Sequence, residues 1–242
     1  GEYFLPPQVV EILRTLQDDS PPLGWAPIEA AMREQLGEVR YNSLEINPEP
    51  LAAASLGQVH RARIKATGDE VVVKIQYPGV AESIDSDLKT LGSLLVMTRL
   101  MPKGLEFNQM MAEVREMLHR EVDYLQELKT TEHFRELLAD DKRYRIPKMY
   151  PDLSGERVLV SSYEPGQNVD GPVVAGLSQD RRNALGVAAM ELFFKEFFEW
   201  GAIQTDPHFG NYRIRLQENN EAGLPDQIVL FDFGAVRQFP DA

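Results

Sequence analysis

The sequence predicts an α+β protein built from two lobes, and three observations support that fold class. Two strand-like segments, 57–65 and 70–77, flank Thr67-Gly68-Asp69, whose Gly-Asp is typical of a hairpin turn. Two long helical patterns follow at about 80–100 and 107–138. A breaker-rich link at 163–166 then precedes a second part of the chain, and a cleft is expected near this link.

The first lobe is expected to follow a helical extension over residues 1–50. Pairs of prolines at 6–7 and 21–22 bracket apolar residues at helical spacing, namely Val9, Ile12, Leu13 and Leu16. A second helix is expected at about 26–36, ahead of the turn-rich segment 47–50. Residues 51–165 are then expected to form the first lobe, with an alanine-rich loop and the two long helices.

The second lobe is expected over residues 166–242. A strand at about 157–162 leads into the link, and a helix follows at about 178–200. Strands are predicted at 212–216 and 227–232, with a polar loop between them. The chain ends soon after this pair, so the second lobe is expected to be incomplete.

Composition narrows the classes of function. The net charge of −13 argues against a nucleic-acid-binding protein, because such proteins neutralise phosphates with basic side chains. The chain has no cysteine, which excludes disulfides, thiol catalysis and cysteine metal sites and fits a reducing compartment. Its histidines show no metal-ligand spacing. No run of about 18 apolar residues is present, so no membrane-spanning helix is predicted.

Two motifs near the end of the chain carry the strongest chemical signal. Asp206 is followed five residues later by Asn211, and Asp232-Phe233-Gly234 ends an apolar strand-like run. Protein kinases use this pair of elements around the phosphates of ATP. Asp206 is expected to accept or orient the proton of an attacking hydroxyl or water, and Asn211 and Asp232 to hold Mg²⁺. Each motif alone is also a good turn sequence, but their order and spacing favour a nucleotide site.

A lysine that meets the phosphates is expected at Lys74. It ends the strand-like run 70–74 and can project from a sheet into a cleft, although an isolated lysine at a strand end is usually solvent-exposed. Such a lysine needs a carboxylate partner. The candidates in the helix predicted at 107–138 are Glu113, Glu116, Glu121, Asp123 and Glu127. Asp123 and Glu127 share a helix face and Glu121 lies off it, and some of these acids belong to a solvated face.

The segment expected to cover the phosphates lacks the usual glycines. Kinases place Gly-x-Gly-x-x-Gly there. Alanine can offer its N–H to phosphate but cannot take the positive φ that glycine allows, so a stiffer loop is expected. The predicted nucleotide-binding residues are Ala52, Ala53, Ala54, Ser55, Gly57, Gln58 and Lys74, together with Tyr163 and Glu164 of the link. A P-loop is not predicted, because Gly-x-x-x-x-Gly-Lys-[Ser/Thr] is absent.

These motifs resemble the UbiB/AarF family of atypical protein-kinase-like proteins. Residues 52–60 resemble the family's replacement for the glycine-rich loop, and Val73-Lys74-Ile75-Gln76-Tyr77-Pro78 resembles its lysine strand. Gln204-Thr205-Asp206-Pro207-His208, with Asn211, resembles its catalytic loop. The resemblance covers nearly the whole chain. It implies a bilobal protein-kinase-like fold with extra N-terminal helices, and ATP or ADP with Mg²⁺ as cofactors.

The resemblance also assigns roles to three of these acids. Glu127 resembles the family's helix αC glutamate, which implies that it pairs with Lys74. Glu121 and Asp123 resemble its Glu-x-Asp signature, expected to face a Lys-x-Gly-Gln motif that lies just upstream of a segment like Tyr3-Phe4-Leu5-Pro6-Pro7. The chain begins at that segment, so it is expected to be a fragment, or the ordered part, of a longer protein. Phe209 stands where the family usually has proline, a change expected to be tolerated.

Two functions follow from the resemblance, because the family is associated with ubiquinone biosynthesis and lipid homeostasis in bacteria, mitochondria and plastids. The first is an ATP-binding enzyme that hydrolyses ATP or phosphorylates a small or lipid-linked acceptor. The alternative is a pseudokinase-like scaffold that uses nucleotide to switch conformation. The enzyme is favoured by the intact set Lys74, Asp206, Asn211 and Asp232, and the scaffold by the alanines. An ordinary Ser/Thr protein kinase is disfavoured by the missing His-Arg-Asp.

The implied partner besides nucleotide is a prenylated quinone precursor or a membrane lipid. The full-length protein would reach it at a membrane surface, from the cytoplasm or an organelle. The chain itself is acidic, so its composition gives little support for membrane binding, because anionic lipid repels acidic surfaces. The best lipid-facing candidates lie in the helix at 80–100: Leu91, Leu94, Leu95, Val96, Met97, Leu100 and Met101. The alternative is that this stripe packs against the helix at 107–138.

Overall fold

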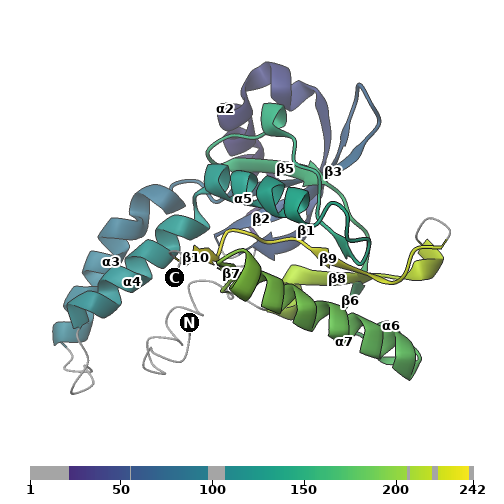
Figure 1. The fold of residues 1–242 in the computed structure, drawn as a ribbon. Helices are drawn as coiled ribbons and strands as arrows, with labels where there is room; N and C mark the ends of the chain where they lie inside the picture. Colours follow the sequence, from purple (N-terminus) through teal and green to yellow (C-terminus); the bar gives the residue numbers. More distant parts are fainter. Residues whose placement is uncertain (1–21, 55, 98–106, 206–207, 220–222, 240–242) are drawn as a thin grey trace. The chain divides into compact units, whose positions relative to one another are not determined.

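The chain has the mixed helix and sheet structure that the sequence predicts (Figure 1). The computed structural model describes residues 22–54, 56–97, 107–205, 208–219 and 223–239, without the side chains of Leu95 and Val96. The chain divides into two compact units, the first made of residues up to 125 with 150–160, the second of 126–149 with 161 onward. Helix α5 (Tyr124–Leu137) and strand β5 (Val158–Ser162) each pass from one unit into the other.

The first unit is built on a four-stranded sheet with the order β1-β2-β3-β5. Its first three strands are β1 (Leu44–Ala54), β2 (Gly57–Ile64) and β3 (Glu70–Gln76). The predicted hairpin is confirmed, because β2 and β3 are antiparallel neighbours and Val59 pairs with Lys74. Gly68 in the connecting turn has a φ of 79°, which glycine adopts without strain.

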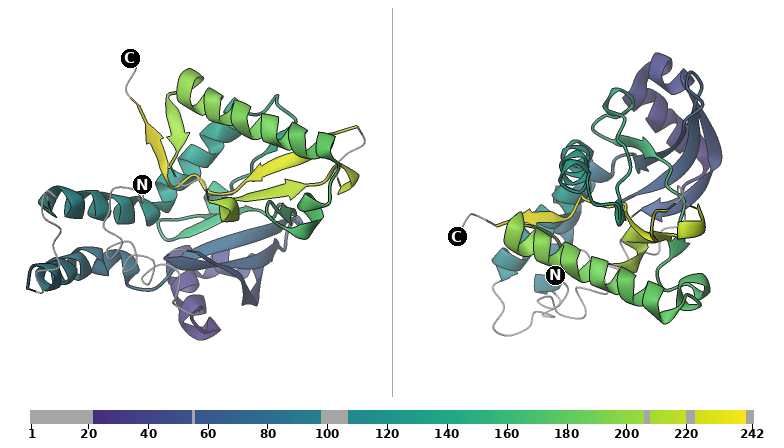
Figure 2. Two further views of the ribbon diagram at one scale, coloured as in Figure 1. Left: turned by 90° about the horizontal axis from the view of Figure 1, so that it is seen from below. Right: turned by 45° about the vertical axis from the view of Figure 1, so that its right-hand side comes forward.

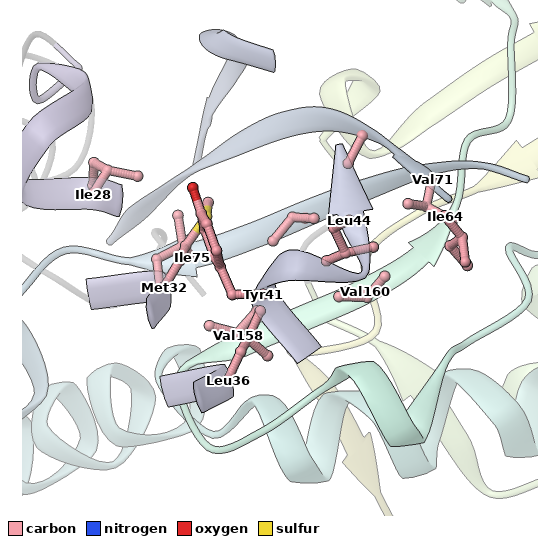
Figure 3. Packing of buried hydrophobic residues seen from close by; sticks show 12 residues of the cluster. Ile28, Met32, Leu36, Tyr41, Leu44, Ile64, Val71, Ile75, Val158 and Val160 are labelled. Atoms are coloured by element: carbon pink, nitrogen blue, oxygen red, sulfur yellow. The ribbon is translucent and has the colours of Figure 1, made fainter. Parts of the chain in front are cut away.

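One face of this sheet carries the core of the first unit. Val71, Val73 and Ile75 alternate along β3 and are fully buried. Helix α2 (Trp25–Asn42) supplies the facing apolar residues. Figure 3 shows the cluster, whose labelled members are Ile28, Met32, Leu36, Tyr41, Leu44, Ile64, Val71, Ile75, Val158 and Val160. Because strand side chains alternate, Lys74 leaves β3 on the face opposite this core.

The turn predicted at 47–50 and the loop predicted from residue 52 are both wrong. These residues belong to β1, where Pro50 pairs with His60 and Ala53 with Gln58. The register shifts between Ile46 and Pro50, and again before Ala52. Strand β1 is at the edge of its sheet, and edge strands with such irregularities can hold prolines. The strand therefore continues through residues that are typical of a turn.

Helices α3 (Val80–Met97) and α4 (Phe107–Glu121) pack against each other. Their shared buried cluster consists of Ile84, Leu88, Met110, Val114 and Leu118. The start of α3 is thus a packing surface, whereas Leu94 and Met97 near its end are exposed. Leu100 and Met101 lie outside the described residues. None of the helices in the described ranges combines the length and the hydropathy that a bilayer crossing requires.

The single helix predicted over 107–138 is wrong, because α4 ends at Glu121 and α5 begins at Tyr124. Gln76 of β3 donates a hydrogen bond from Nε2 to the Val122 carbonyl, at 2.6 Å. The Asp123 N–H bonds to the Arg120 carbonyl at 3.0 Å. Aspartate is also favoured immediately before a helix. A side chain from the sheet thus takes the place of a helical partner and separates the two helices.

The second unit contains a four-stranded sheet with the order β4-β9-β8-β6 and a two-stranded sheet of β7 and β10. The predicted strand pair is confirmed as β8 (Tyr212–Arg215) and β9 (Gln227–Leu230), which are antiparallel. The sequence does not predict the short strands β4 (Tyr144–Arg145), β6 (Gln167–Asn168), β7 (Ala202–Gln204) and β10 (Val236–Gln238). They contain only two or three residues each, too few to show a periodic pattern.

Helix α7 (Gln179–Phe194) lies beside the β8–β9 pair (Figure 2). It follows the short helix α6 (Pro172–Ala175) and continues into a π-helical turn, η3 (Lys195–Glu199). The predicted helix at 178–200 is therefore regular only as far as Phe194. In the core of this unit, the Phe134 ring lies 4.9 Å from that of Phe233 and 5.7 Å from that of Trp200, between ring centroids.

Candidate nucleotide-binding site

Lys74 is held at the start of α5 by an aromatic ring. It is half-buried on β3, between Val73 and Ile75, which are fully buried on the other face. Its Nζ lies 5.0 Å from the centroid of the Tyr124 ring, within the range of a cation–π interaction. The ring is itself buried. The ring of Tyr124 therefore contacts the ammonium group on the sheet face away from the core.

The three alanines belong to an antiparallel ladder and not to a loop. Ala52 pairs with Val59, Ala53 with Gln58, and Ala54 with Gly57. Ala52 and Ala53 are exposed, and Ala54 is half-buried. The ladder fixes the backbone of this segment, so its stiffness does not depend on the φ range of alanine. Ser55 lies outside the described residues. Contact of this segment with nucleotide stays a prediction.

Gly57 is required by the sheet itself. A Cβ on Gly57 would stand 2.2 Å from the carbonyl oxygen of Ile75 on β3. Real Cβ atoms essentially never approach backbone so closely, so the two strands would have to separate. The single glycine left in the alanine-rich segment thus has a structural reason that is independent of nucleotide.

The side chain of Gln58 is part of a buried polar network. Its Oε1 accepts a hydrogen bond from the Leu23 N–H at 3.0 Å, and its Nε2 lies 2.8 Å from Nε2 of His60. Nδ1 of His60 lies 2.8 Å from the Asn47 carbonyl oxygen, which can only accept. Burial lowers the pKa of His60, which fits a neutral imidazole that donates from Nδ1 and accepts at Nε2. The Gln58 amide therefore ties the residues before α2 to the sheet, and only its backbone is left to meet a ligand.

The three acids at the junction of α4 and α5 differ in environment. Glu121 ends α4 and is half-buried, Asp123 is exposed, and Glu127 is 4% exposed on α5. The sequence predicts that Asp123 and Glu127 share a helix face. This prediction is wrong, because the helix is broken between residues 121 and 124 and Asp123 lies outside both helices. Lys74 belongs to the first unit and Glu127 to the second, so their pairing stays a prediction.

Glu127 and Asp232 flank the same glycine. A Cβ built on Gly234 would stand 3.3 Å from Oδ1 of Asp232 and 3.6 Å from Oε2 of Glu127. The Gly234 N–H also donates to Asp232 Oδ1 at 2.9 Å. Two carboxylates of the second unit therefore lie close together, one of them in the Asp-Phe-Gly motif. A cation bound near such a pair would offset its charge.

The β8–β9 register brings the two predicted metal ligands to one end of this strand pair. Tyr212 pairs with Leu230, and the Phe231 N–H donates to the Asn211 carbonyl at 3.1 Å. Asn211 precedes the first pair and Asp232 follows it on the neighbouring strand. Amide and carboxylate oxygens are ligands that Mg²⁺ prefers. The donor set fits Mg²⁺, which takes one or two carboxylates and completes its shell with water and phosphate oxygens.

The segment ahead of Asp206 is tied to the segment after Asp232. The Thr205 N–H and its hydroxyl both donate to the Ala235 carbonyl, at 2.9 and 2.7 Å. Gln204 pairs with Val236 in the β7–β10 ladder. Asp206 itself lies outside the described residues. The second unit thus brings both predicted motifs together, and the role of Asp206 as proton acceptor stays a prediction.

Glu164 of the link forms ion pairs with arginines. Its carboxylate lies 2.6 Å from Arg145 Nε and 3.4 Å from an Arg215 terminal nitrogen, and it accepts from the Ser162 hydroxyl at 2.9 Å. The side chain is buried in this network. Glu164 therefore braces the link, and nucleotide contact by Glu164 would use its backbone. Tyr163 is half-buried, and its contact with nucleotide stays a prediction.

Glu196 is a candidate that sequence reasoning does not find. It lies on the π-turn and its Oε2 accepts a hydrogen bond from the Gln204 N–H at 3.2 Å. Burial raises the pKa of Glu196 to about 7. The local sequence also contains Glu191 and Glu199, and nothing in their spacing selects the one that faces inward.

Comparisons with known proteins agree with this reading of the chain. Residues 15–242 match the ABC1 atypical kinase-like domain. The chain is 35% identical over 244 residues to the mitochondrial atypical kinase COQ8 of Schizosaccharomyces pombe, covering 98% of this chain and 38% of that protein. It is 34% identical to the mitochondrial COQ8 of Saccharomyces cerevisiae, covering 99% and 46%. The chain thus spans less than half the length of these relatives.

A solved structure has a similar fold. The complex of Rv3197 with erythromycin from Mycobacterium tuberculosis matches with a TM-score of 0.73 at 28% identity, covering 98% of this chain and 58% of that one. The kinase-like α+β fold that the motifs predict is thereby confirmed. Because the family match extends over most of the sequence, the chain belongs to the ABC1 family of atypical kinase-like proteins, the UbiB/AarF family that its motifs resemble.

Proposed function

We propose that this chain is the nucleotide-binding part of an atypical kinase or ATPase that uses ATP or ADP with Mg²⁺. The observation that carries the proposal is the β8–β9 register, which places Asn211 and Asp232 at one end of a rigid strand pair. Glu127 adds a second carboxylate beside Gly234. Asn211 and Asp232 would supply the oxygen ligands that such a site requires.

The remaining residues would act on the phosphates and the acceptor. Lys74 would pair with the phosphates from the face of β3 that lies away from the core, with Glu127 as the carboxylate that positions it. Asp206 would accept or orient the proton of the attacking hydroxyl or water. Asn211 and Asp232 would hold Mg²⁺, whose positive charge would offset the charge that develops on the phosphates during transfer. Ala52, Ala53, Ala54, Ser55, Gly57 and Gln58 would approach the phosphates through their backbone, and Tyr163 and Glu164 would contact the nucleotide from the link.

Thermal unfolding with and without Mg-ADP or Mg-ATP tests this proposal. A ligand that binds the folded state raises the melting temperature. We expect stabilisation by nucleotide with Mg²⁺, a smaller effect with EDTA, and a loss of the effect in Asp232→Asn. Asp170→Asn, which removes an exposed acid from the same unit, is the matched control. No stabilisation of the wild type by any Mg-nucleotide would refute the proposal.

A scaffold that uses nucleotide without phosphoryl transfer is the second candidate. It is favoured by the ladder of Ala52–Ala54, which holds the segment proposed to cover the phosphates in one conformation. Steady turnover of Mg-ATP that is lost in Asp206→Asn would support the enzyme. Tight nucleotide binding with equal, background turnover in the wild type and Asp206→Asn would support the scaffold.

We also propose a role in ubiquinone or other lipid metabolism. The support is that the relatives are named COQ8 and described as mitochondrial. The corresponding partner is a prenylated quinone precursor or a membrane lipid, met at a membrane surface in an organelle or the cytoplasm. Flotation of the full-length protein with liposomes, with and without nucleotide, tests this role. If the full-length protein does not associate with liposomes in either condition, a soluble acceptor should be sought instead.

A further inference from the structure

Glu196 is buried while its aromatic neighbours are exposed. The Trp200 N–H bonds to the Lys195 carbonyl at 2.9 Å, the spacing of a π-turn. Glu196 is 4% exposed, whereas Phe197 is 46% and Phe198 is 73% exposed. The extra residue in the turn thus directs a carboxylate inward and two phenylalanines outward. Single π-turns of this kind are frequent at functional sites.

The inward carboxylate holds the strand that leads into the predicted catalytic loop. Oε2 of Glu196 accepts a hydrogen bond from the Gln204 N–H at 3.2 Å. The Gln204 side chain accepts from the Tyr212 hydroxyl at 3.0 Å, which ties β7 to β8. Gln204 is therefore fixed through its backbone and its side chain, two residues before Asp206.

The charge of this carboxylate can change near neutral pH. Burial raises the pKa of Glu196 to about 7, and the hydrogen bond from Gln204 opposes that rise. Burial also raises the pKa of Tyr144 on β4 to about 12, and the charge of Glu196 adds to this rise. The other charged groups around this phenol and the π-turn are Arg143, Lys195, Asp141, Glu191 and the exposed Glu199. The first four form ion pairs with one another, so Arg143 and Lys195 are engaged by carboxylates other than Glu196.

We propose that Glu196 is a positioning residue whose carboxylate anchors Gln204, the last residue of β7, two positions before Asp206 in the sequence. The inference rests on the proposed function, because it assumes that the predicted catalytic loop serves phosphoryl transfer or hydrolysis. An ionised carboxylate accepts an N–H more strongly than a neutral acid does. Glu196 should therefore hold Gln204 and the end of β7 more firmly when it is ionised, without touching the nucleotide.

If Glu196 acts in this way, loss of its charge should affect the turnover of Mg-ATP and not the affinity for it. Asn211 and Asp232 are held by the β8–β9 ladder, which Glu196 does not join. Loss of its charge should lower kcat and leave the KM for Mg-ATP unchanged. A charge-assisted hydrogen bond is about twice as strong as a neutral one, so we expect a change of about fivefold in kcat.

The first test needs neither nucleotide nor turnover. The amide ¹H–¹⁵N resonance of Gln204 is followed by NMR as the pH is raised from about 5 to about 9, on either side of the pKa. We expect the resonance to titrate with a midpoint near 7 in the wild type and in His208→Gln, and not to titrate in Glu196→Gln. A resonance that does not titrate in the wild type would overturn the proposal. This measurement does not depend on whether any variant folds. The proposal would also be overturned if the titration of the Gln204 resonance were lost in His208→Gln and kept in Glu196→Gln.

The second test compares pH profiles of Mg-ATP turnover. Wild-type kcat should rise through neutral pH, and Glu196→Gln should give a flat profile, about fivefold lower than the wild type at high pH. Glu199→Gln is the matched control, because it removes an exposed carboxylate from the same turn and should follow the wild type. A change in KM alone, or equal effects of the two substitutions, would overturn the proposal. If the wild type has no turnover, the proposed function fails, and the NMR titration still decides whether Glu196 anchors Gln204.

Discussion

At the scale of single residues, the buried carboxylate of Glu196 makes stability depend on pH. Its pKa is raised from 4.5 to about 7, so between these values the folded protein keeps a proton that the unfolded chain releases. Stability therefore falls as the pH rises through this window, and the full cost of about 3 kcal/mol is present above it. Glu196→Gln removes the ionisable group and should be more stable than the wild type at alkaline pH.

Urea unfolding at two pH values measures this difference. Glu196→Gln should unfold at a higher urea concentration than the wild type at about pH 8, and the advantage should vanish near pH 4.5. Glu199→Gln should show no such pH-dependent gain. An advantage of Glu196→Gln that is the same at both pH values would contradict the assignment. Because the carboxylate lowers stability at neutral pH, its presence is better explained by function than by folding.

Two glycines should respond in opposite directions to alanine. Gly57→Ala places a Cβ against the Ile75 carbonyl, which must move, and should destabilise the protein by more than roughly 2 kcal/mol. Gly186 lies within α7, and a Cβ there meets nothing within 4 Å. Gly186→Ala should therefore stabilise the protein by up to about 1 kcal/mol through helix propensity. Thermal melts of both variants test the pair, and equal shifts would show that the close approach at Gly57 does not exist.

At the scale of elements, the break between α4 and α5 depends on one side chain from β3. Gln76 is buried, donates to the Val122 carbonyl and accepts from Arg157 at 3.1 Å. Gln76→Leu leaves that carbonyl without this donor and should cost roughly 1–3 kcal/mol. Hydrogen exchange at residues 121–126 should accelerate. Gln109→Leu, at an exposed position on α4, is the control and should leave this exchange unchanged.

This break also shows where sequence reasoning ends. Met111, Val114, Leu118, Val122 and Leu125 continue a helical spacing without interruption, so local pattern predicts one helix. The cause of the break lies 46 residues away, on β3. The hairpin of β2 and β3 is predictable because its strands and its Gly-Asp turn are adjacent. Strand β1 is not predictable, because Pro48 and Pro50 are typical of turns and only pairing with β2 reveals the strand.

The residues of the candidate site also differ in whether the sequence alone predicts their placement. The placement of Asn211 and Asp232 at one end of the β8–β9 pair is predictable, because both motifs adjoin predicted strands. Their role as metal ligands stays a prediction. The inward direction of Glu196 depends on the hydrogen-bond pattern of a π-turn, which no residue spacing reveals. The burial of Gln58 depends on its contacts with Leu23 and His60, one of them distant in sequence.

At the scale of the whole molecule, the residues of the proposed site are shared between the two units. Lys74 and the alanines of β1 belong to the first unit, whereas Glu127, Asn211 and Asp232 belong to the second. Neither unit alone has both the lysine and the metal ligands. Nucleotide binding should therefore depend on an energetic link between the units, and the pair expected from the family resemblance is Lys74 with Glu127.

A double-mutant cycle on Mg-ADP affinity measures that link. If Lys74 and Glu127 form an ion pair, Lys74→Met and Glu127→Gln should each weaken binding, and the double variant should lose less than their sum, with a coupling of roughly 0.5–3 kcal/mol. The same cycle with Glu121→Gln in place of Glu127→Gln should be additive within about 0.5 kcal/mol, because Glu121 is expected to serve another contact. Coupling of Lys74 to Glu121, with additivity at Glu127, would reverse the assignment. It would leave Glu127 as a partner of the Asp232 site, where its carboxylate already flanks Gly234.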